Sequence, residues 1–423
     1  MKIALRLATI ILWLFSAFIS RAQLADKHAI PVIRSDTGRS DSILKVCKSP
    51  DDCSTQKDVI DVVRNILHKG TGNRSDTGEI KSQKLRTSVV PAAGYTLQTD
   101  MAVLVAANAA FYTHKDANQS TILTSLTYTA RNQVIFPIQT NLWTRGNKYN
   151  IVVDWRYLYY PSYTFGLGGY TTSNDGYIID YSTIHLHQAV LRELAEDMYA
   201  GIGYNMDYFW DIHEINPPGN KSTDFENYGY SKTEFASGFT FNYLYDTRKN
   251  SINPEQGNYV NVVYRPNLTL FGNTANWRSL IIDLRKYIKF PAGSRNVLAL
   301  WSYEWFTIDG KAPYLMLPNT GGDPNSNTGR GYIQARFRGA NMAYIEGEYR
   351  FGITRNGLLG GVVFANAESF TEQVSNNFET IAPGWGAGIR LKFNKFSRTN
   401  VALDYGFGLN GSGGVFVNIG EVF

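Results

Sequence analysis

The chain has 423 residues, of which 18% are charged and 14% are aromatic, with 38 glycines and a formal net charge of +5. Removal of an N-terminal signal peptide would leave 38 basic against 36 acidic residues, a balance that excludes the basic footprint of a nucleic-acid-binding protein. Abundant aromatics and glycine, with no run of 18 apolar residues for a transmembrane helix, favour a β-barrel, whose strands cross a bilayer with about ten alternating residues each.

The N-terminus predicts a secretory signal peptide over residues 1–22. Lys2 and Arg6 precede a short apolar run, and the small residues Ser20 and Ala22 stand before the expected cleavage site. A single anchoring helix is the alternative, but the apolar run is short for a bilayer span of about 20 residues. We therefore expect an exported protein.

Residues 23–84 are expected to form a polar periplasmic segment with one helix. Apolar residues recur there at helical spacing, at Val59, Ile60, Val62, Val63, Ile66 and Leu67. This helix could bind a partner, pack under the barrel or serve as a short structural element. Cys47 and Cys53 precede it, and an oxidising compartment favours a local disulfide over two free thiols. A zinc site would need further ligands nearby.

From residue 85 onward the apolar residues recur with a period of two, as β-strands require. For example, Leu403, Tyr405 and Phe407 alternate with Asp404 and Gly406. One face suits lipid, and the other suits a wet or plugged interior. The pattern predicts an all-β fold, a transmembrane β-barrel of sixteen antiparallel strands, at 85–96, 101–112, 120–131, 133–143, 148–160, 177–192, 197–211, 233–245, 257–270, 275–290, 296–308, 339–352, 357–367, 384–394, 399–409 and 413–423.

An even number of strands returns the chain to the side on which it entered the barrel. With residues 23–84 in the periplasm, the segments outside the cell are the long ones, 161–176, 212–232, 309–338 and 368–383. We expect residues 85–423 to be an integral barrel in the outer membrane of a Gram-negative bacterium, surrounded by outer-membrane lipid.

Three motifs stand out along the predicted barrel. The turn "DTRKNSINPEQG" contains Asp246, Arg248, Pro254 and Gly257, and the segment "GRGYIQARFRG" begins at Gly329. The C-terminal stretch "VFVNIGEVF" contains Phe416, Asn418, Gly420 and Phe423. In this order they resemble the periplasmic turn, the sixth external loop and the closing β-signal of the bacterial surface antigen superfamily, which includes the BamA and TamA assembly factors and the two-partner secretion transporters.

The resemblance implies a sixteen-stranded barrel whose sixth loop folds back into the lumen. Arg330, followed by Gly331 and Tyr332, would then lock the loop by pairing with acidic residues on the inner wall. Glu346 and Glu348 share the inward face of the next strand by the period of two, and Glu348 is the expected partner. Pairing is required because an unpaired buried charge is costly.

Two departures limit what the resemblance implies. Asn366 stands where the family often has Asp, so one carboxylate of the lock is missing, and residues 23–84 lack the βααββ pattern of a POTRA repeat. We therefore expect a barrel-only relative of assembly and translocation factors, accessory to a larger outer-membrane machine and inserted by the barrel assembly machinery. A periplasmic or outer-membrane protein is the expected kind of partner. A passive channel or structural barrel is the alternative, and a barrel hydrolase is a weaker one.

No catalytic, cofactor-binding or metal site is predicted. His185 and His187 lie two apart on one strand face, but the sequence supplies no third ligand at a suitable spacing. No Gly-x-Ser-x-Gly elbow or phosphate loop occurs between a strand and a helix. We expect neither enzyme activity nor a nucleic-acid partner.

The disulfide is the first testable prediction. Cys47 and Cys53 are expected to be joined, since both follow the signal peptide and close a short loop. Mass spectrometry of unreduced, alkylated protein should find both sulfurs unmodified, and a reduced sample should carry two alkyl groups. Alkylation of both thiols without reduction would contradict the prediction.

Overall fold

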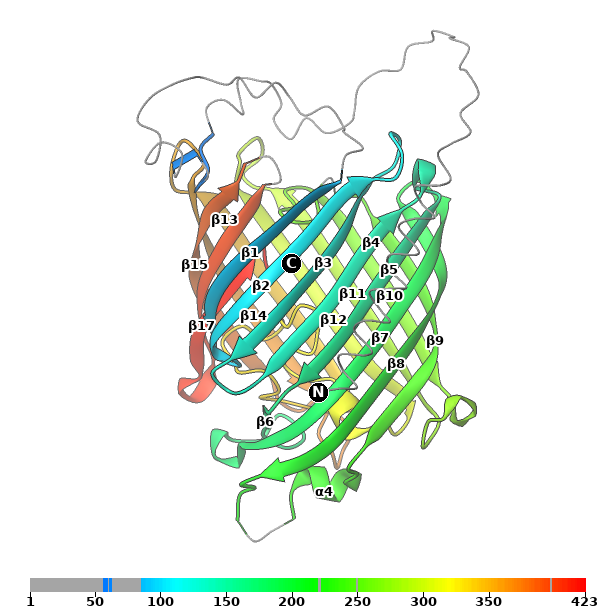
Figure 1. Cartoon of the computed structure of the whole chain (residues 1–423). Coiled ribbons are helices and arrows are strands. Elements are labelled where there is room, and N and C mark those ends of the chain that lie inside the picture. The colour runs from blue at the N-terminus through cyan, green and yellow to red at the C-terminus, as the bar shows by residue number, and fades with distance from the viewer. Residues whose placement is uncertain (1–55, 60, 63–84, 220–221, 249, 396–397) are drawn as a thin grey trace. The chain divides into compact units, whose positions relative to one another are not determined.

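The structure is a computed structural model that describes residues 56–59, 61–62, 85–219, 222–248, 250–395 and 398–423 (Figure 1). The predicted signal peptide, Cys47 and Cys53 lie outside these ranges. No described helix is long and apolar enough to span a membrane. One sheet of seventeen strands dominates the described part.

Neighbouring strands of the sheet pair in antiparallel fashion. The bounds are β1 Arg86–Thr96, β2 Asp100–Tyr112, β3 Gln119–Thr129, β4 Val134–Trp143, β5 Tyr149–Tyr159, β6 Ser162–Thr164, β7 Tyr177–Ala195, β8 Met198–Ile215, β9 Glu234–Asp246, β10 Gly257–Asn267, β11 Trp277–Lys289, β12 Val297–Gly310, β13 Asn341–Gly352, β14 Leu359–Phe370, β15 Ala382–Asn394, β16 Thr399–Phe407 and β17 Gly413–Ile419. Both β5 and β6 pair with β7, so β6 continues β5 and the barrel has sixteen strand positions. The predicted all-β fold of sixteen antiparallel strands is confirmed.

The sheet curls until β17 lies beside β1, which makes a nearly closed barrel (Figure 1). Leu97, just after β1, fills the place of the missing side chain of Gly414, where a Cβ would lie 2.2 Å from Leu97 Cδ2. Among the described strands, backbone ladders join every consecutive pair around the barrel, but none joins β1 to β17, and we call this junction the seam. Pro91 in β1 has no N–H to donate, as is typical of an edge strand.

The period of two in the sequence becomes two faces of the barrel wall. On β16, Leu403, Tyr405 and Phe407 are exposed on the outer face, whereas Asp404 is buried inside. On β13, Ile345 is likewise exposed on the outside. Large apolar side chains on an outer surface suit lipid contact better than water contact.

The two ends of the barrel differ. The four long connections, 160–176, 216–233, 311–340 and 371–381, all lie at one end, as the strand directions require. There the helix α4 (Asp224–Gly229) packs its buried Phe225 against Tyr314 of the 3-10 turn η4 (Tyr314–Met316), with ring centroids 5.0 Å apart. Gly168 forms a β-bridge with Arg338, which joins connection 160–176 to connection 311–340. These connections form a cap over the barrel end.

At the opposite end, residues 56–59 and 61–62 contact the short turns. Lys57 N donates to Asn356 O at 3.0 Å, between β13 and β14. Asp58 accepts from Lys395 N at 3.0 Å, and Asp61 pairs with Lys395 Nζ at 2.9 Å, between β15 and β16. Of the three roles left open for the predicted helix, this placement favours packing against the end of the barrel.

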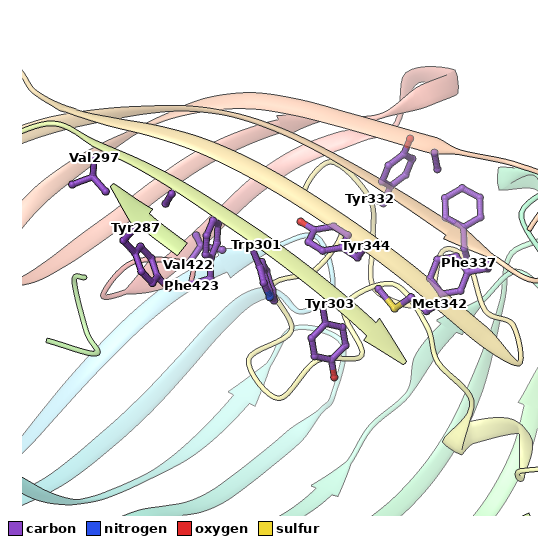
Figure 2. Packing of buried hydrophobic residues seen from close by; sticks show 13 residues of the cluster. Tyr287, Val297, Trp301, Tyr303, Tyr332, Phe337, Met342, Tyr344, Val422 and Phe423 are labelled. Carbon is purple, nitrogen blue, oxygen red and sulfur yellow. The ribbon is translucent and has the colours of Figure 1, made fainter. Parts of the chain in front are cut away.

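A hydrophobic cluster fills the interior along β11, β12 and β13 (Figure 2). Alternate residues of β12 point inward, and Trp301 packs edge-on against Tyr344 of β13 at 5.1 Å. Tyr332, from the connection 311–340, joins the same cluster. Phe423 lies between Trp301 and Tyr287, at 5.0 and 6.2 Å between ring centroids. One side of the barrel interior is therefore packed like a protein core.

The predicted end of the last strand was wrong. A strand through Phe423 was predicted, but β17 ends at Ile419. Gly420 has φ +99°, a value that favours glycine, and the chain turns inward there. Phe423 then gains burial among aromatic rings, and its carbonyl oxygen accepts from Arg350 Nη2 at 3.0 Å. We call residues 420–423 the tail.

We expect Phe423→Ala to destabilise the folded barrel, because it removes a buried ring that Trp301 and Tyr287 enclose. Truncation of a buried Phe to Ala costs about 3–5 kcal/mol. The temperature at which heat-modifiable migration on gels is lost should fall. The matched control is Phe241→Ala, whose ring is exposed on the outer face and should leave that temperature nearly unchanged. Equal effects of both substitutions would contradict the internal placement of Phe423.

Candidate functional site

The connection 311–340, which we call the inserted loop, lies with its backbone directly against the inner face of β16. Gly331 has φ +114°, and a Cβ there would lie 2.5 Å from Phe407 O. Conversely, a Cβ on Gly406 would lie 2.7 Å from Gly331 N. Such close approach of two backbones requires glycine on both sides. This is the physical reason for the glycine after Arg330.

Arg330 is 1% exposed and reaches from the inserted loop to two strands of the wall. Its Nη1 donates to Asp404 Oδ2 at 2.6 Å, and its Nη2 donates to Glu346 and Glu348. Its guanidinium also lies 3.7 Å from the ring centroid of Phe364. Burial alone would lower the pKa of Arg330, but the surrounding carboxylates raise it well above its ordinary value, so the side chain stays charged.

Arg330 belongs to a closed ring of alternating charges. The members of this ionic ring, in order, are Arg330, Asp404, Arg390, Glu421, Arg350 and Glu348. Arg390 pairs with Asp404 at 2.5 Å and with Glu421 at 2.7 Å, from Nη1 and Nε respectively. Arg350 Nε lies 3.6 Å from Glu421 and donates to Glu348 Oε2 at 2.7 Å. The ring therefore connects the inserted loop, β13, β15, β16 and the tail.

Polar contacts fix the loop at Arg330 and at the two residues that follow it. Asn366 Nδ2 donates to Arg330 O at 2.9 Å, and Ser412 Oγ donates to Gly331 O at 2.7 Å. Tyr332 donates its hydroxyl hydrogen to Pro383 O at 2.7 Å. Asn366 thus holds the backbone of the motif, whereas the carboxylate missing from its position is supplied by β16.

Residues 323–327, which we call the tip of the inserted loop, contact two further parts of the barrel. Asp323 Oδ1 accepts from the backbone N–H of Asn327 at 2.8 Å, which closes a tight turn. Asn327 Nδ2 then donates to Val422 O in the tail at 2.6 Å. On the other side of the tip, Arg156 of β5 donates to Pro324 O at 2.7 Å. The loop is therefore attached to the wall at its base and at its tip.

The structure brings together the three charged residues named from sequence, Arg330, Glu346 and Glu348, and it places Asn366 against the backbone of Arg330. Sequence reasoning missed Asp404, Arg390 and Glu421. Asp404 and Arg390 lay on the polar faces of two predicted strands, which was the available signal. Arg390 faces Ala402 in the ladder, so Asp404 is its diagonal neighbour on the same face. The strand register that makes them neighbours is not visible in either strand alone.

The turn motif forms a separate structure between β9 and β10. Arg248 pairs with Asp246 through two bonds of 2.9 Å and lies 4.1 Å from the ring centroid of Tyr259. Gly257 has φ +118° and approaches Thr247 O, while Pro254 is buried in the same turn. In the C-terminal motif, Phe416 and Asn418 lie on β17 before the tail. The turn motif does not contribute to the ionic ring, whereas the C-terminal motif contributes Glu421.

No family model matches the chain, and no curated protein sequence matches it. Solved structures do match. BamA from Haemophilus ducreyi lacking POTRA domains 1–3 superposes with a TM-score of 0.50 and 11% identity, over 79% of this chain and 68% of that chain. The barrel has the fold of BamA. CdiB from Acinetobacter baumannii gives 0.52 and 11%, over 80% of this chain and 60% of that one, and CdiB from Escherichia coli gives 0.53 and 10%, over 81% and 63%. The chain spans less than two thirds of either CdiB.

We expect Arg330→Ala to loosen the inserted loop, because it leaves three buried carboxylates without their shared partner. Breaking a buried pair in this way costs about 3–5 kcal/mol. Protease cutting within 311–340 and leakage of small solutes should both rise, while the barrel stays inserted. Arg330→Lys should rescue only in part, since a point charge cannot replace the planar fork.

The matched control is Arg278→Ala, which removes an exposed pair with Asp309 and should change neither readout. Parent-like cutting and leakage in Arg330→Ala would show that the ring does not hold the loop.

Proposed function

We propose that the chain is an outer-membrane barrel of the assembly or translocation type, without enzyme activity of its own, which acts as an accessory to a larger machine. The observation that carries this proposal is the inserted loop, held in the interior by the ionic ring. The fold shared with BamA and CdiB supports it. In this proposal the end with residues 56–59 and 61–62 faces the periplasm, and the cap faces outward.

A passive channel is less well supported because the inserted loop and the tail occupy one side of the barrel interior. Aromatic rings of β12 and β13 pack with the inserted loop and the tail, and the cap joins several connections at the outer end. These elements narrow the path that solutes would take through the barrel. The interior is instead built to hold one loop in a fixed position.

The seam is the proposed place of contact with a client or partner protein. An unladdered strand edge presents unpaired N–H and C=O groups to a strand of another chain. On the lipid side of the seam, Val89 of β1 is 68% exposed. The partner class that fits such an edge is an outer-membrane or periplasmic protein with a free β-strand.

Site-specific photo-cross-linking in intact cells tests the proposal. A cross-linker at Val89 should give protein adducts, whereas one at Ile345, which is 60% exposed on the outer face of fully laddered β13, should give none. Purified protein in planar bilayers should show little steady conductance. If Val89 gave no adducts and the protein showed large steady conductance, the passive channel would be favoured. If it gave neither adducts nor conductance, a structural barrel would be favoured.

A further inference from the structure

A second cluster of polar side chains lies on the inner wall, apart from the ionic ring. His185 and His187 come from β7, Asp207 from β8 and Arg265 from β10. In the ladder between β5 and β7, His185 faces Arg156, whose side chain contacts the inserted loop at Pro324. The two histidines therefore point into the lumen, as Arg156 does.

The cluster has the composition and spacing of a metal-ligand set. His185 Nδ1 lies 2.5 Å from Asp207 Oδ1, and His187 Nε2 lies 2.7 Å from the same oxygen. One ligand atom from each of the three residues falls within 4.8 Å of the others. The third ligand that the sequence did not reveal comes from β8, because Asp207 is the direct ladder partner of His185.

Arg265 orients the carboxylate from behind. Its Nη1 donates to Asp207 Oδ2 at 2.5 Å, and its Nη2 donates to Ala236 O at 3.2 Å. Asp207 is buried, and this pairing occupies one oxygen while Oδ1 is directed at the two imidazoles. A ligating carboxylate is usually held by a hydrogen-bond partner that does not touch the metal and that leaves one carboxylate oxygen for the ion.

The histidines leave an open side toward the lumen. Their side chains are 21% and 35% exposed, in contrast to the buried carboxylate. Three protein ligands on one side and access on the other is the arrangement of a site with free coordination positions, as in sites that combine two imidazoles with one carboxylate. Small molecules or water in the lumen could fill those positions.

We propose that His185, His187 and Asp207 bind one divalent transition-metal ion on the inner wall of the barrel. Two imidazoles with a single carboxylate suit zinc, cobalt, nickel or copper, whereas magnesium and calcium need more oxygen ligands. The bound ion would connect β7 to β8 next to the strand that holds the tip of the inserted loop. The competing explanation is a cluster of hydrogen bonds that only orients Arg265.

Titration of Co²⁺ into the chelator-stripped, full-length protein in detergent separates the two explanations. Visible absorption should show one Co²⁺ per chain, displaced by Zn²⁺. His185→Gln and His187→Gln should each weaken Co²⁺ binding by more than about 100-fold. Loss of a residue that only supports a metal ligand weakens binding by roughly 10–100-fold. The matched controls are His213→Gln and His114→Gln, since each of these histidines pairs with a single aspartate, Asp180 and Asp116. Both controls should bind within about threefold of the parent.

Heat-modifiable migration establishes that each variant is folded. A second measurement needs no variant: electron paramagnetic resonance of the parent with one equivalent of Cu²⁺ should show coupling to two imidazole nitrogens. The proposal is overturned if the parent binds no Co²⁺, if the His185 and His187 variants bind as tightly as the controls, or if the Cu²⁺ spectrum lacks nitrogen coupling.

Discussion

The interior of this barrel depends on pairing of buried charge. Three arginines and three carboxylates alternate in the ionic ring, so each guanidinium has opposite charges on both sides. A buried charge without a partner is costly, and a fully connected network avoids that cost only while every member is present. Because the members come from a loop, three strands and the tail, closing the ring also fixes where these segments lie.

The remaining features of the interior follow from that placement. Arg330 reaches both Asp404 and Glu346 only if the loop backbone lies on β16, which explains why Gly331 and Gly406 meet there. The tail contributes Glu421 to the ring, so the chain has to turn inward at Gly420. Phe423 is thereby carried into the aromatic cluster of β12. Packing and charge pairing thus select the same arrangement.

The sequence predicted the elements far better than their contacts. A period of two is a local property, so all sixteen strand positions could be found one at a time. Arg330 and Glu348 were named because a motif carries them. Asp404 and Asp207 were missed because their roles arise from strand register, which a single strand does not contain. The inward turn at Gly420 was missed because the strand predicted at 413–423 extends past it, whereas β17 ends at Ile419.

The inserted loop is attached to two walls that lie on opposite sides of the seam. Arg330 ties its base to β13 and β16, whereas Arg156 ties its tip to β5 and Asn327 ties it to the tail. In the order of the strands, β13, β16 and the tail lie on one side of the seam between β17 and β1, and β5 lies on the other. Where the backbone ladder is missing, the loop therefore connects the two walls from inside. A barrel with this brace can keep its shape without a ladder at the seam, which leaves the edges of β1 and β17 available to another strand.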